Sequence, residues 1–129
     1  EYHISGLKRM WNQSIGKIGE QLSVNFLKEA GIKIITRNFR TEYGEIDIIG
    51  LDNYDLVFFE VKTRSTKIFG EPEIAISETK LSHMVNSAAA YMQTYGQDEN
   101  WRLDVIAVSL NKSKKTNRIH WIKNVTESY

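Results

Sequence analysis

The chain has 129 residues, of which 41% are hydrophobic and 26% are charged, and these proportions are typical of a single globular domain. It contains no cysteine, which excludes disulfide frameworks, thiolate zinc sites and cysteine nucleophiles and fits a reducing compartment. The formal net charge of +1 is too small to indicate a polyanionic partner by itself, so any such argument depends on where the charges lie.

Neither a membrane segment nor a secretory signal is expected. No apolar run approaches the roughly 18 to 20 residues of a membrane span, and the first residues lack the pattern of a signal sequence. We therefore expect a cytoplasmic protein. Residues 1–13 show no clear periodicity and are interpreted as an N-terminal extension, with vector-derived residues as one explanation, and residues 14–129 as one domain.

The first predicted element is a helix from Ser14 to Ala30. Apolar residues recur there three and four positions apart, as on one face of a helix. Ser14 has the chemistry of an N-cap, and Gly31 follows as a C-terminal stop signal. The members of the apolar stripe are Ile15, Ile18, Leu22 and Phe26.

Three strands are predicted next. Residues 32–37 are expected to form the first strand, and residues 38–44 a connection. Residues 45–51 and 56–64 are rich in Ile, Val and Phe, and the polar stretch "DNYD" between them is typical of a hairpin turn.

The rest of the chain predicts a helix and two further strands. The lone proline, Pro72, lies in a loop, after which Ser77 is expected to cap a helix over residues 77–96. Strands are predicted over 102–110 and 119–125. The order αβββαββ combines an antiparallel meander with a helical crossover, so we predict an α/β (α+β) fold whose mixed sheet is flanked by helices.

The hairpin carries ionisable residues inside otherwise apolar strands. If its turn is centred on residues 53–54, paired residue numbers sum to about 107, which places Asp47 opposite Glu60 and Glu45 opposite Lys62. Because side chains alternate between the faces of a strand, Asp47, Glu60 and Lys62 are expected to converge on one face. The core residues expected on the other face are Ile46, Ile48, Phe59 and Val61.

Two facing carboxylates repel each other and destabilise a sheet. At about 5 Å and an effective dielectric near 20, the repulsion is on the order of 3 kcal/mol. Lys62, a shared proton or a divalent cation could offset it, and Mg²⁺ is the simplest choice because carboxylates and water are its preferred ligands. The alternative interpretation is a structural ion network of Asp47, Glu60 and Lys62 without a metal.

An acidic residue followed at this distance by Glu-x-Lys, here Asp47 and "EVK" (60–62), resembles the core of the PD-(D/E)XK nuclease superfamily. The longer pattern, about residues 14–125, resembles the YraN-like family of bacterial proteins. This resemblance implies a restriction-endonuclease-like domain with a four-stranded mixed sheet, as in Holliday-junction resolvases. The stretches that carry it are "GKIGE" (16–20), "RNFR" (37–40), "YGEIDII" (43–49), "LVFFEVKTR" (56–64) and "RLDVIAV" (102–108).

The resemblance also implies metal-dependent hydrolysis of phosphodiesters. One or two Mg²⁺ (or Mn²⁺) ions would polarise a phosphoryl oxygen and lower the pKa of a bound water. Lys62 would position that water or stabilise the developing negative charge, and Glu45 would support the site as a partner of Lys62 or Arg64. The residues expected to hold the metal are Asp47, Glu60, the Val61 carbonyl and Glu20.

A phosphodiester substrate also needs cations along its backbone. Trp11, Trp101 and Trp121 could stack on bases, although core or rim positions are the simpler interpretation. Asp104 is expected to pair with Arg102 on a strand face. The residues we expect to contact nucleic acid are Thr63, Arg64, Lys80, Arg40 and Lys67.

These features lead to a Mg²⁺-dependent endonuclease acting on DNA as the first hypothesis. The comparison with resolvases suggests branched or structured DNA as the substrate and a homodimer as the assembly. The first alternative is a catalytically inactive nucleic-acid-binding module of the same fold. The second is a scaffold that binds a protein partner through the hairpin.

Overall fold

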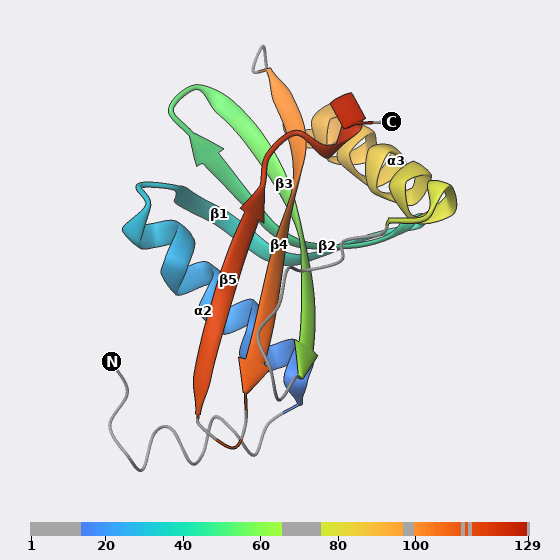
Figure 1. The fold of residues 1–129 in the computed structure, drawn as a ribbon. Coiled ribbons are helices and arrows are strands. Elements are labelled where there is room, and N and C mark those ends of the chain that lie inside the picture. The colour runs from blue at the N-terminus through green and yellow to red at the C-terminus, as the bar shows by residue number, and fades with distance from the viewer. Residues whose placement is uncertain (1–13, 66–75, 97–99, 112, 114, 129) are drawn as a thin grey trace.

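The computed structural model confirms the predicted order of elements, with one short 3₁₀ helix added at the C-terminal end (Figure 1). It describes residues 14–65, 76–96, 100–111, 113 and 115–128. Among these residues, neither α-helix is long and apolar enough to cross a membrane. The elements are α2 (Ile15–Glu29), β1 (Lys33–Thr41), β2 (Gly44–Asp52), β3 (Asp55–Ser65), α3 (Glu78–Tyr95), β4 (Trp101–Asn111), β5 (Thr116–Ile122) and η1 (Val125–Ser128).

The strands form one mixed sheet in the order β1-β2-β3-β4-β5. Strands β1, β2 and β3 make the predicted antiparallel meander, β4 runs parallel to β3, and β5 returns antiparallel to β4. The parallel step is the one that follows α3, because parallel neighbours need a long crossover connection. The sheet has five strands, so the four-stranded sheet that the resemblance implied is wrong. The periodicity had indicated all five.

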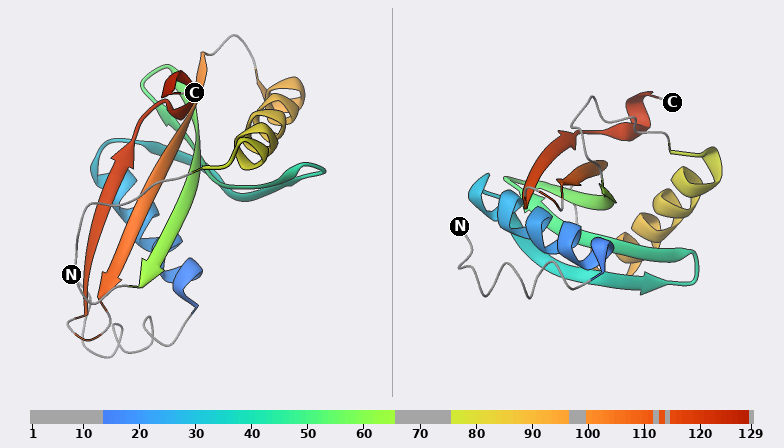
Figure 2. Two further views of the ribbon diagram at one scale, coloured as in Figure 1. Left: turned by 45° about the vertical axis from the view of Figure 1, so that its right-hand side comes forward. Right: turned by 60° about the horizontal axis from the view of Figure 1, so that its bottom comes forward.

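Residues 38–44 are not a connection, as the sequence suggested, because β1 continues to Thr41. Pairing with β2 resumes beyond Asn38, where Phe39 lies opposite Ile46. Asn38 itself has a left-handed φ of 54°, which asparagine tolerates better than most residues. The resulting β1–β2 turn extends past α3 in the left view of Figure 2.

The two helices cover different faces of the sheet (Figure 2). Phe59 of β3 packs in one core with Ile18 and Leu27 of α2, and its neighbour Phe58 packs in the other core with Met84 of α3. This is the alternation expected of a strand that is buried on both faces. The central strands are therefore apolar on both sides, and each charged residue among them needs an explanation.

One predicted core residue lies on the other face of the sheet. Ile48 joins Phe59 and Val61 in the α2 core as expected, but Ile46 packs in the α3 core. Two residues separated by one position share a face only while alternation is regular. The alternation is interrupted at Asp47, which lies next to the left-handed Asn38 of β1.

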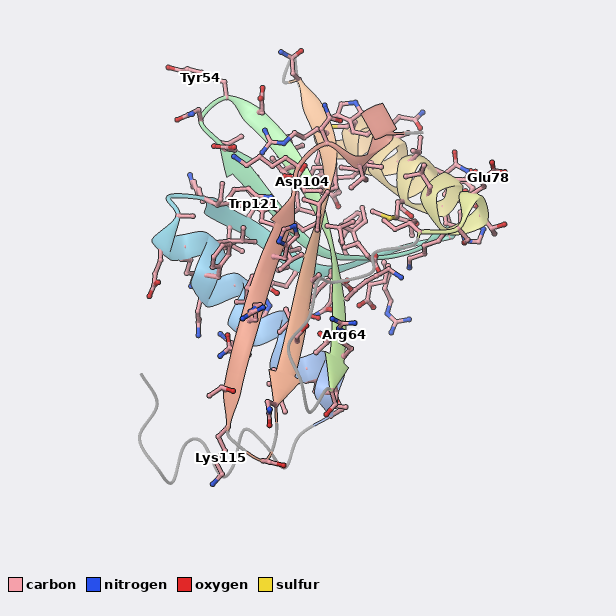
Figure 3. All side chains as sticks on the ribbon, viewed as in Figure 1. Tyr54, Arg64, Glu78, Asp104, Lys115 and Trp121 are labelled. Carbon is pink, nitrogen blue, oxygen red and sulfur yellow. The ribbon has the colours of Figure 1, made fainter. Side chains whose placement is uncertain are left out.

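A buried ion network closes the end of the sheet at the β2–β3 turn. Asp104 of β4 is fully buried and accepts hydrogen bonds from Arg102, from Trp121 Nε1 (2.9 Å) and from the Asn124 backbone N–H (2.8 Å). Figure 3 shows Asp104 and Trp121 side by side. Arg102 also binds Asp52 at 2.8 Å. The predicted pairing of Asp104 with Arg102 is confirmed, and it is buried because β5 and η1 cover it.

Helix α2 lies very close to β3 at Gly19. A Cβ atom at this position would overlap the Thr63 side chain, with Thr63 Cβ only 2.7 Å away. Glycine is therefore required here for close helix–strand packing. The next residue along the helix is Glu20, so this contact places its carboxylate relative to β3.

We expect Gly19→Ala to lower the free energy of unfolding by about 2 kcal/mol, because a β-branched side chain cannot move aside cheaply in a packed core. Gly16→Ala, in the same helix, is the matched control: a Cβ there has no neighbour within 4 Å. It should leave stability unchanged or raise it by up to about 1 kcal/mol. Urea denaturation of both variants measures the difference, and equal effects would contradict the packing account.

Candidate active site

The candidate site lies where β2 and β3 separate. Their pairing has the predicted register but ends at Ile48–Phe59, so Asp47 and Glu60 fall one step beyond the last pair. The Val61 backbone N–H donates instead to Asp47 Oδ2 at 2.7 Å. A side chain thus satisfies a backbone donor that the sheet no longer pairs.

The Asp47 carboxyl is hard to ionise in this position. Burial, together with the negative charges of Glu60 and Glu20, raises its pKa to about 7. The Val61 N–H and Lys80 act in the opposite direction. Burial also raises the pKa of Glu60, against the lowering effects of Lys80 and Lys62. The predicted clustering of Asp47 with Glu60 is therefore present, although the ladder does not make them a hydrogen-bonded pair.

Glu60 has an ion pair with α3. Lys80 Nζ lies 3.3 Å from Glu60 Oε1, and the side chains are 41% and 12% exposed respectively. Ser77 starts α3 by accepting the Lys80 backbone N–H at 3.1 Å, which sets Lys80 in the first helical turn. Lys62 lowers the pKa of Glu60 through its charge, but the described residues give Lys62 no ion pair.

Glu20 of α2 lies close enough to Asp47 to raise its pKa, but its carboxylate already binds two residues of β1. Its Oε1 accepts from Asn38 Nδ2 at 2.9 Å and from Arg37 Nη2 at 3.2 Å. Two consecutive residues of β1 reach one carboxylate because the left-handed Asn38 interrupts the alternation. Sequence reasoning missed these partners of Glu20. The available signal was the asparagine, since this residue is enriched in left-handed conformations.

The donor set fits a hard cation with few protein ligands. Among the described residues, no three Asp, Glu or His side chains form a group that could hold a metal ion. Asp47 and Glu60 nevertheless offer carboxylate oxygens close to each other, since the charge of Glu60 contributes to the raised pKa of Asp47. Mg²⁺ commonly binds through one or two carboxylates and retains several waters. Val61 adjoins both carboxylates, because it follows Glu60 in β3 and its N–H binds Asp47.

Glu45 lies near Glu60, since its negative charge raises the pKa of that carboxyl, but its ion pair is with β1. Glu45 lies opposite Arg40 on β1 and pairs with it at 3.5 Å, not with Lys62 or Arg64. The Arg40 side chain is 87% exposed, so it remains available to a large ligand at the β1–β2 turn. Lys67 lies outside the described residues.

Two other predicted nucleic-acid contacts lie on β3. Arg64 is exposed near the end of the strand (Figure 3), and its Nε donates to Ser109 Oγ at 3.2 Å. The structure does not favour a phosphate contact for Thr63, because its Oγ1 is buried toward Gly19 with no hydrogen-bond partner in the described residues.

The tryptophans fit the simpler interpretation. Trp121 packs at the edge of the α2 core and donates to Asp104. Trp101 is 37% exposed and stacks edge-on against Phe58, which makes it a rim aromatic. Trp11 lies outside the described residues.

The raised pKa of Asp47 predicts a pH-dependent loss of stability. The folded carboxyl titrates at about 7 instead of 3.8. The contribution of the protonated Asp47 to the free energy of unfolding is therefore fully present below about pH 4 and is lost as the pH rises through about 7. A shift of this size is about 4 kcal/mol for an enclosed group, and partial solvent exposure reduces it to about 2 kcal/mol. We expect Asp47→Asn to match the wild type near pH 4 and to be more stable by that amount near pH 8.

Urea denaturation across this pH range measures the effect. Glu42→Gln is the control, because Glu42 is exposed in the β1–β2 turn and its neutralisation should give no comparable dependence. A constant offset between Asp47→Asn and the wild type at all pH values would contradict the assignment.

Comparisons with known proteins agree with the motifs. The family model described as "Uncharacterised protein family UPF0102" matches residues 19–108. A UPF0102 protein from Syntrophus aciditrophicus is 40% identical over 117 residues, covering 90% of this chain and 91% of the relative. Another from Alkaliphilus oremlandii is 44% identical over 106 residues, covering 80% and 91%.

Among solved structures, a repair endonuclease from Pyrococcus abyssi matches 72% of this chain and 39% of its own, with a TM-score of 0.44 and 20% identity. The sequence relatives decide the family. Both cover nearly their whole length, and the matched range contains Glu20, Asp47, Glu60 and Lys80. The chain therefore belongs to the UPF0102 family, the YraN-like group that its motifs indicated.

Proposed function

We propose that this protein is a metal-dependent nuclease that hydrolyses DNA phosphodiesters at the Asp47–Glu60 site. The observation that carries the proposal is the pair of partly buried carboxylates on neighbouring strands, whose pKa values are both raised. A structural ion pair would lower the pKa of a carboxyl. Groups perturbed in this direction and lying beside lysines are typical of reactive sites.

The chain offers ligands and charges suited to this chemistry. Mg²⁺ or Mn²⁺ would be held by Asp47, Glu60 and the Val61 carbonyl, with Glu20 nearby. When bound, the ion supplies Lewis-acid activation of a phosphoryl oxygen and lowers the pKa of a water. Lys62 would stabilise the negative charge that develops on the phosphate during attack.

The surroundings of the site offer cations for a DNA backbone. Arg40 projects on the β1–β2 turn, and Arg64 lies on β3, two residues after Lys62. Such contacts position a duplex without reading its sequence. Branched or structured DNA is the substrate class suggested by the likeness of the motif to that of resolvases.

Cation binding is expected to raise the thermal stability of the wild type. Bound cation relieves the repulsion between Asp47 and Glu60, and a ligand that binds only the folded state stabilises it. With Mg²⁺ in large excess over its dissociation constant, we expect the melting temperature to rise by about 4 °C near pH 8. Asp47→Asn should show less than half of this rise. An equal rise in both proteins would place the cation elsewhere.

Cleavage is tested on a panel of linear, single-stranded, flapped and four-way DNA with Mg²⁺, Mn²⁺ or EDTA. We expect cleavage only with a cation, and a rate at least about 100-fold lower for Asp47→Ala, Glu60→Ala and Lys62→Ala. DNA binding should persist in Lys62→Ala. Glu42→Ala, in the exposed turn, is the control and should cleave normally.

The second candidate is an inactive nucleic-acid-binding module. It is favoured by the pairing of Glu60 with Lys80 and by the lack of a three-residue metal group in the described part of the chain. It predicts salt-dependent DNA binding that survives Asp47→Ala and needs no cation. The same DNA panel therefore separates the two functions.

A further inference from the structure

The closest cation to Glu60 comes from α3 and not from the Glu-x-Lys motif. Lys80 Nζ forms the 3.3 Å ion pair with Glu60 Oε1, whereas Lys62 forms none in the described residues. Lys80 also exceeds Lys62 in its influence on Glu60 and acts on Asp47 as well. The ammonium group of Lys80 therefore binds the carboxylate of Glu60, which would have to be free to bind a metal ion.

We infer that Lys80 is a positioning residue. Its ammonium group is paired with the Glu60 carboxylate when no divalent cation is bound, and it turns to the DNA phosphate when a divalent cation binds to Glu60. This inference rests on the proposed function, because it takes Glu60 as a metal ligand. It adds a coupling: cation binding makes a phosphate-binding group available, so the cation and the substrate should strengthen each other's binding.

The geometry allows the Lys80 side chain to move while its backbone stays in place. The first turn of α3 is held by the Ser77 cap and by the packing of Leu81 and Met84 against the sheet. The Lys80 side chain is 41% exposed, whereas the Glu60 side chain is 12% exposed. A long and flexible ammonium chain can therefore leave the carboxylate at small cost.

Charge supplies the reason for the movement. A divalent cation at Asp47 and Glu60 neutralises both carboxylates, which leaves the Lys80 ammonium without the counter-charge that Glu60 supplies. Glu20 does not compete for Lys80, because Arg37 and Asn38 already bind it. The anion that the proposed reaction brings to this place is a phosphate, and a lysine binds phosphate as a point charge.

The first test is titration of the protein with Mn²⁺ by calorimetry, without DNA. Lys80→Met removes the competing charge and keeps the side-chain length, so its affinity for Mn²⁺ should exceed that of the wild type by about 5-fold. Lys28→Met, in the last turn of α2, is the control and should be unchanged. Unchanged affinity for Mn²⁺ in Lys80→Met would overturn the inference. Lys80→Gln, which also removes the charge, should show the same increase in affinity as Lys80→Met.

The second test follows Lys80 itself. Acetylation by a water-soluble reagent, mapped by mass spectrometry, should be at least about 3-fold faster at Lys80 with Mn²⁺ than with EDTA, because an ion-paired ammonium is protected. Acetylation of Lys28 should not change. Equal rates at Lys80 in both conditions would show that it is not released.

The third test measures the coupling to DNA. Affinity for a fluorescent duplex is compared in EDTA and in Ca²⁺, which takes the same oxygen ligands as Mg²⁺, with the duplex checked for integrity. The cation should raise the affinity of the wild type several-fold, and Lys80→Met should lose at least half of that gain. An undiminished gain in Lys80→Met would overturn the coupling.

Glu60→Gln separates failure of this inference from failure of the proposed function. If Glu60→Gln still binds Mn²⁺ as the wild type does, the proposed metal site is wrong. If Glu60→Gln loses binding while Lys80→Met matches the wild type, the metal site stands and only the role of Lys80 fails.

Discussion

The burial of two neighbouring carboxyl groups, Asp47 and Glu60, where β2 and β3 separate, is the constraint on which the rest of the site depends. Burial raises the pKa of both groups, so the folded chain carries them at a cost near neutral pH. Aliphatic residues would stabilise this part of the sheet better. The backbone adapts to the pair: strand pairing stops one step before them, and the Val61 N–H binds Asp47 in its place.

The two helices bring opposite charges to this pair from different faces of the sheet. Helix α2 contributes Glu20, which makes Asp47 harder to ionise, and helix α3 contributes Lys80, which makes it easier. Glu20 is in turn anchored by β1. The site therefore combines one α-helix from each layer with the three strands of the meander, and the approach of α2 at Gly19 sets the spacing between layers.

The buried Asp104 shows what a structural carboxylate in this fold looks like. It receives hydrogen bonds from Arg102, Trp121 and Asn124, and it shares the positive charge of the Arg102 guanidinium with Asp52. A buried carboxylate with such partners keeps its place in the core by being satisfied. Asp47 has one backbone donor and two acidic neighbours. This contrast, more than the presence of acidic residues in strands, distinguishes the Asp47–Glu60 pair from a structural carboxylate and is the basis of the proposed cation site.

The sequence by itself determined the order of elements and the register of the β2–β3 hairpin, because periodicity and turn chemistry are local. From them followed the clustering of Asp47 with Glu60. Only the tertiary structure decided that Ile46 faces α3, because a left-handed Asn38 in the neighbouring strand leaves no mark in an apolar pattern. It alone decided that Lys80 pairs with Glu60. These two residues meet because a helix packs across the sheet, and such long-range packing depends on the whole chain and not on any one segment.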